Sequence, residues 1–158
     1  MTWETIPVRR ETKEFLERVK EAYGIKSYDE LLKRAFSVSK SETLDLSKTV
    51  PPKTGYVWYE NYREVPFDGT INQIILSFPK GCKGLVEVRV GVAGSQGLNW
   101  ICPREGFIAL EATTQPFNVT YPVKKGDRVV AEIYNYDDTY EHTIGVTVVL
   151  TSKPMIII

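Results

Sequence analysis

The stretch Glu87-Val88-Arg89-Val90-Gly91-Val92 alternates polar and apolar residues at a strict period of two. Such alternation is typical of a strand with one face on a core and the other in water. Three further stretches in the second half repeat the pattern, and the longest is 142–150. Turn residues such as Asp68-Gly69 and Asp137-Asp138 close the runs. The pattern predicts a mainly β fold, an antiparallel β-sandwich of jelly-roll-like topology over residues 55–158.

Turn signals divide this region into short candidate strands. We expect strands at 56–60, 62–67, 70–78, 85–93, 98–102, 106–112, 117–122, 128–136, 142–151 and 154–158. Alternation also assigns one face of the clearest strands to the core. The residues expected in the interior are Ile74, Leu76, Phe78, Val86, Val88, Val90, Val92, Val129, Ala131, Ile133, Ile144, Val146, Val148 and Leu150.

The beginning of the chain has a different period. Apolar residues between positions 11 and 23 form one stripe of a 3.6-residue helix. Ser27, with Glu30 three residues later, is a capping box that starts a second helix. We therefore predict a small helical hairpin as a head over residues 1–46. A polar linker is expected at 47–54, before the β body.

Charge and cysteine content limit the classes of function. Lys plus Arg and Asp plus Glu both total 20, and residues 1–46 hold nine of each sign. Neither part is basic enough to indicate electrostatic binding of nucleic acid. The two cysteines, Cys82 and Cys102, are too few for a disulfide scaffold or a four-ligand metal site. Two free thiols are favoured, and a single disulfide stays open as the alternative.

The termini show no targeting signal. The N-terminus lacks the basic start and apolar run of a signal peptide. The longest apolar run, 155–158, is far too short to span a bilayer. We expect a cytoplasmic protein with no membrane insertion.

The strand-like segment 3–8, the run 10–17, Gly24 and the run 27–32 together resemble the ribbon-helix-helix repressors and related antitoxins. The resemblance implies a dimer formed by pairing of the two N-terminal strands, and binding to DNA. The DNA-binding residues would be Trp3, Thr5, Arg9, Arg10 and Lys13. Nucleic acid is therefore one possible partner, although the balanced charge does not favour it.

The segments 65–71, 78–81, 123–127 and 135–138 resemble parts of structural proteins of phages and archaeal viruses. That resemblance implies a β body that works by self-association or by binding a surface partner, without chemistry. It also implies the virion as an alternative location.

Two groups of aromatic residues are the strongest surface signal. The first contains Trp58, Tyr59 and Tyr62, and the second contains Tyr134, Tyr136 and Tyr140. Such rings are enriched at protein interfaces and in sugar-binding grooves, but they also cover the ends and edges of sandwiches. The apolar C-terminus, with Ile156 and Ile157, either completes a sheet within the chain or contacts a neighbouring subunit.

No pattern predicts an enzyme. His142 is the single histidine, and a hydrogen-bonded strand residue is its favoured interpretation over a catalytic one. The acidic pair Asp137-Asp138 is interpreted as a solvated turn, because it lacks the spacing of a calcium loop. No catalytic residue, metal or cofactor is expected.

These observations favour a non-enzymatic structural or interaction protein. Homo-oligomerisation, or binding of an unknown protein or glycan through the β-sandwich, would be its activity. A DNA-binding regulator and a carbohydrate-binding module are the alternatives.

Overall fold

The computed structural model describes residues 9–35, 37–56, 60–153 and 155–156. The chain forms two compact units. The helical unit contains Met1–Val38 and Pro154–Ile158, and the sandwich unit contains Ser39–Lys153. Each unit is described separately below.

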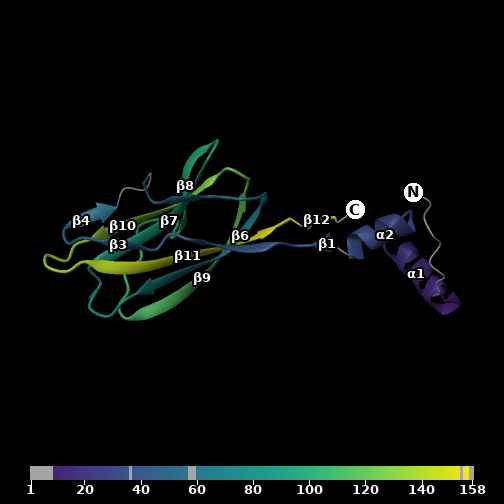
Figure 1. Cartoon of the computed structure of the whole chain (residues 1–158), viewed down its shortest axis with the longest axis horizontal. Helices are drawn as coiled ribbons and strands as arrows, with labels where there is room; N and C mark the ends of the chain where they lie inside the picture. The colour runs from purple at the N-terminus through teal and green to yellow at the C-terminus, as the bar shows by residue number, and fades with distance from the viewer. Residues whose placement is uncertain (1–8, 36, 57–59, 154, 157–158) are drawn as a thin grey trace, which may run out of the picture. The chain divides into compact units, whose positions relative to one another are not determined.

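The sandwich unit consists of two antiparallel sheets (Figure 1). The first has the order β4-β10-β7-β8, with β5 also paired to β10; these strands are Thr54–Tyr56, Arg128–Asn135, Val86–Gly94, Gly97–Cys102 and Tyr62–Glu64. The second has the order β2-β11-β6-β9, with β3 also paired to β11; these strands are Ser41–Asp45, His142–Ser152, Gly69–Phe78, Thr113–Val123 and Lys48–Val50.

The strand order is that of a jelly roll. β2 and β3 pair with successive stretches of β11, and β4 and β5 pair with successive stretches of β10. Each couple therefore acts as one interrupted strand. Numbered in this way, the two sheets have the orders 1-8-3-6 and 2-7-4-5. Such an arrangement confirms the predicted jelly-roll-like sandwich.

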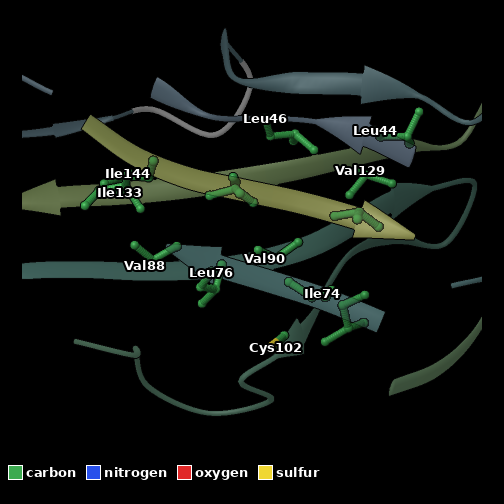
Figure 2. Close-up of a cluster of buried hydrophobic side chains, with 14 of the residues drawn as sticks. Leu44, Leu46, Ile74, Leu76, Val88, Val90, Cys102, Val129, Ile133 and Ile144 are labelled. Carbon is green, nitrogen blue, oxygen red and sulfur yellow. The ribbon is translucent and has the colours of Figure 1, made fainter. Parts of the chain in front are cut away.

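The core lies between the two sheets, where side chains from both inner faces meet (Figure 2). Every residue that alternation assigned to the interior is buried there. Leu44 and Leu46 add to this core from the start of the unit. Period-two alternation identifies the interior residues correctly because a shift of the strand register by one residue would expose a whole row of apolar side chains to water.

The structure differs from the sequence prediction in several segments, of which two lie between residues 47 and 112. Residues 47–54 were predicted as a linker, but this segment contains β3 and the first residue of β4. Residues 106–112 were predicted as a strand, but only a single bridge between Ile108 and Val88 forms there. In the first case a strand of three residues buries only Val50, so no alternation is visible.

The helical unit contains α1 (Arg10–Ala22), α2 (Tyr28–Ala35) and the two-stranded pair of β1 (Ser37–Val38) with β12 (Met155–Ile156). Both predicted helices are present. The Ser27 hydroxyl accepts a hydrogen bond from the Glu30 amide at 3.1 Å, as the capping box requires. The first segment of this unit ends at residue 38, earlier than the predicted boundary at 46, and the unit also takes in residues 154–158, which were predicted as part of the β-sandwich.

The thiols of Cys82 and Cys102 are free and buried, as favoured from the sequence. Burial raises the pKa of the Cys102 thiol to about 11, so it stays protonated at neutral pH. Within the described part of the chain, neither helix has the length and apolar character needed to cross a bilayer.

Leu76 in β6 has no exposed surface and lies in the middle of the core. We expect Leu76→Ala to lower the free energy of unfolding by about 2–5 kcal/mol, because the cavity cannot collapse between two rigid sheets. Urea unfolding followed by circular dichroism measures this change. Gln115→Ala, at an exposed position of β9, should change it by less than about 0.5 kcal/mol. Equal effects of the two substitutions would contradict this view of the core.

Candidate ligand-binding groove

The connection between β10 and β11, at the left end of the sandwich in Figure 1, is fixed by a buried amide. Asn135 is 1% exposed, and its amide nitrogen lies 3.1 Å from the carbonyl oxygens of Val50 and Pro51 and 2.9 Å from that of Tyr140. Its side-chain oxygen accepts the amide of Asp137 at 2.9 Å. The Asn135 side chain therefore joins both ends of the β10–β11 loop, at Asp137 and Tyr140, to the backbone at Val50 and Pro51.

Asp137 completes this network. One carboxylate oxygen accepts the amides of Thr139 at 2.8 Å and Tyr140 at 3.0 Å, and the other lies 2.9 Å from Nε2 of His142. The Thr139 amide, the His142 ring and the Tyr140 amide together lower the pKa of Asp137 to about 2. Asp137 is therefore ionised at neutral pH, and the loop backbone is held around it.

This loop exposes two of the predicted aromatic residues. Tyr136 is 56% exposed and Tyr140 is 67% exposed. The ring of Tyr136 stacks on that of Tyr134, with centroids 6.3 Å apart and an angle of 17° between the planes. Tyr134 is itself fixed by an edge contact with Phe107 at 5.4 Å. The exposed ring of Tyr136 thus rests on a supported aromatic layer.

The connection between β6 and β7 is fixed in a similar way. The carboxylate of Glu111 accepts the amide of Gly81 at 2.8 Å and the amide of Lys83. These two amides lower the pKa of Glu111. The carbonyl oxygen of Leu85 accepts the amide of Tyr136 at 2.8 Å, which joins this connection to the β10–β11 loop.

A groove of about 680 Å³ lies between the two connections. Its lining consists of one segment from each loop, Lys80 to Leu85 and Tyr136 to His142. Among these residues are two exposed tyrosines, ammonium groups and carboxylates. The sequence predicted the tyrosines, but it gave no signal for the groove or for the residues that fix its walls.

Two other predicted aromatic residues, Tyr62 and Tyr134, belong to the first sheet and do not line the groove. Tyr62 in β5 lies under the guanidinium group of Arg128, 4.7 Å from the ring centroid. Tyr134 faces the outer side of the sheet, where its hydroxyl donates to Glu132 at 2.7 Å. Both therefore pack on the sheet, which was one of the alternatives left open by the sequence.

The other candidate residues have different positions. Arg9 and Lys13 are exposed, and Arg10 forms an ion pair with Glu14 at 3.0 Å. Ile156 belongs to β12, which pairs with β1 inside the chain. The candidates that lie outside the described residues are Trp3, Thr5, Trp58, Tyr59 and Ile157.

The interpretation of His142 as a hydrogen-bonded strand residue is confirmed, since it is 7% exposed and hydrogen-bonded to Asp137. The prediction of a solvated acidic turn holds for Asp138, which is exposed and contacts Lys53 at 3.3 Å. It is wrong for Asp137, which is 8% exposed because its carboxylate is engaged by two loop amides and the His142 ring. Across the described ranges, no three histidine, cysteine, aspartate or glutamate residues come together in a way that would hold a metal ion.

Comparison with known proteins gives no match to a protein family or to a curated protein. Among solved structures, the chain is similar to the capsid asymmetric unit of cyanophage Pam1, with 14% identity and a TM-score of 0.43, over 73% of this chain and 86% of that one. It is also similar to infectious bursal disease virus, Gx strain, with 10% identity and a TM-score of 0.43, over 72% of this chain and 32% of that one. Both of these solved structures are viral.

Because Asp137 ionises more readily in the folded state, its contribution to stability is complete above its ordinary pKa of 3.8. That contribution is lost as the pH falls toward about 2. We expect Asp137→Asn to lower the melting temperature at pH 7 and to weaken its dependence on pH between about 4 and 2. Circular dichroism melts across this range measure the effect. Asp138→Asn, at the exposed neighbour, should behave like the wild type. If the melting temperature of Asp137→Asn fell between about pH 4 and pH 2 as steeply as that of the wild type, Asp137 would not be the source of the pH dependence.

Proposed function

We propose that the protein is a non-enzymatic structural protein that self-associates, with the jelly roll as its rigid body and the helical unit as its contact surface. The observation that carries this proposal is the apolar surface of the helices. Phe15 is 58% exposed and Leu32 is 49% exposed. Across residues 9–32, whose burial the structure describes, only Ile25 and Leu31 are buried.

Such a surface needs a partner. Both helices are amphipathic, yet two short helices and a two-residue strand pair bury too little apolar area to be stable alone. Exposed apolar side chains on the apolar face of an amphipathic helix are typical of an association surface. Burial of this stripe against another chain would supply the missing core.

Charge favours a second copy as that partner. Residues 9–32 contain six basic and six acidic side chains. A surface with both signs can be complementary to itself across a twofold axis, whereas a polyanion such as DNA requires a basic excess. The proposal therefore prefers self-association to the DNA-binding alternative.

The sandwich is suited to a structural role. Its interior is filled with aliphatic side chains, and three of its buried polar residues, Asn135, Asp137 and His142, hydrogen-bond within the turn network. Jelly rolls with two such sheets recur in viral capsid domains, and a virion is the location that this proposal implies.

The test is the molar mass of the full chain in solution, measured by light scattering and sedimentation. We expect a multiple of the 18.0 kDa chain mass. Phe15→Glu places a charge in the apolar stripe and should weaken association by about thirtyfold or more, which corresponds to the 2 kcal/mol of a typical hot spot.

Arg10→Glu is the matched control, because Arg10 is 92% exposed in the same helix. This variant should keep the wild-type mass, and circular dichroism should show unchanged helix content in both variants. A wild-type chain that is monomeric at high concentration would overturn the proposal. Equal dissociation by both substitutions would also overturn it, since charge rather than the apolar stripe would then control assembly.

A further inference from the structure

We infer that the groove between the β6–β7 and β10–β11 connections binds an oligosaccharide. This inference concerns the sandwich unit and does not depend on self-association through the helices. It rests on three properties of the groove: its exposed aromatic rings, its mixed polar lining and the fixed backbone of both walls.

The first property is the pair of exposed rings. A tyrosine at the surface usually packs its ring against neighbouring side chains and exposes mainly its hydroxyl. Tyr136 and Tyr140 are instead more than half exposed and line the same groove. The ring of Tyr136 is held parallel to that of Tyr134, so its orientation is set before a ligand arrives. Flat rings held in this way present a surface for the C–H face of a sugar ring.

The second property is the chemistry between the rings. The lining includes the ammonium groups of Lys80 and Lys83 and the carboxylates of Asp138 and Glu141. Sugar hydroxyls both donate and accept hydrogen bonds, so they suit a lining that contains donors and acceptors together. A strongly charged ligand would meet repulsion from one of the two sets. The groove therefore favours a neutral, polyhydroxylated ligand.

The third property is that the walls are already ordered. The Asn135 and Asp137 side chains hold the loop that carries both tyrosines. Glu111 holds the opposite wall through two backbone amides. Because these contacts fix the loops in the free protein, binding would cost little conformational entropy. The volume of about 680 Å³ lies in the usual range of ligand sites and suits two or three sugar rings.

Formation of this loop costs free energy, because it buries several polar side chains. Burying Asn135, Asp137 and His142 at one end of an aliphatic sandwich requires every group to find a partner. A shorter turn could join β10 to β11 without any of them. In the structure, this hydrogen-bond network holds the backbone of the loop that carries the two exposed tyrosines.

The experiment uses the full chain on a printed array of oligosaccharides. Isothermal titration calorimetry then measures the affinity for soluble neutral hexasaccharides of glucose, mannose, xylose and N-acetylglucosamine. We expect binding to at least one neutral glycan. Tyr136→Ala and Tyr140→Ala should each weaken it by about tenfold, because each removes one stacking surface. Tyr140→Phe keeps the ring and should retain most of the affinity.

Tyr23→Ala is the matched control. Tyr23 is 72% exposed in the helical unit, outside the groove, and its loss should leave glycan affinity unchanged. Melting temperatures check that the alanine variants are folded. The inference is overturned if the wild type binds no neutral glycan, or if both groove variants bind as well as Tyr23→Ala. The Phe15→Glu variant should bind in solution with wild-type affinity per chain, so failure of self-association and failure of glycan binding are separate results.

Discussion

The structure depends on one constraint, the closure of two sheets over a single layer of aliphatic side chains. Each long strand supplies every second residue to this layer, and the opposite residues face outward. Valine, isoleucine and leucine dominate the layer, and the ones at its centre have no exposed surface. Hydrophobic burial of this kind sets the register of each strand, because a shift by one residue would expose the whole row.

Closure of the sheets determines where function can lie. Aliphatic side chains fill the centre of the interior, and a pocket of about 860 Å³ lies at the margin, lined by residues of β8 in one sheet and β9 in the other. The edge strand β9 carries Pro116 and Pro122, both exposed. Proline has no amide to donate, and its presence at an edge opposes the addition of a further strand. The loops at the end of the sandwich and the helical unit are the surfaces on which exposed aromatic and apolar side chains gather.

The sequence was sufficient for the fold wherever a strand was long enough to show its period. It predicted the interior face of β6, β7, β10 and β11 and both helices. It missed β2 and β3 because strands that bury one or two residues show no periodicity. Among the residues that line the groove, the sequence predicted only Tyr136 and Tyr140 as binding candidates, because they belong to a cluster of aromatic residues. Glu111 could not be found in this way, since its partners lie about 30 residues earlier in the chain.

The interaction of His142 with Asp137 illustrates why residue type alone is a poor guide to chemistry. In sequence, a histidine beside two aspartates suggests a base with its orienting carboxylate. In the structure, both carboxylate oxygens of Asp137 are occupied, one by two backbone amides and the other by the imidazole. Both residues are buried, and both belong to the lining of the groove. The hydrogen bonds of Asp137 hold the loop backbone and the imidazole, and they fix the position of Tyr140. The same reasoning applies to Glu111, whose carboxylate holds two amides of the opposite wall. The carboxylates of Asp137 and Glu111 thus order the two loops, and ordered loops are what a binding surface requires.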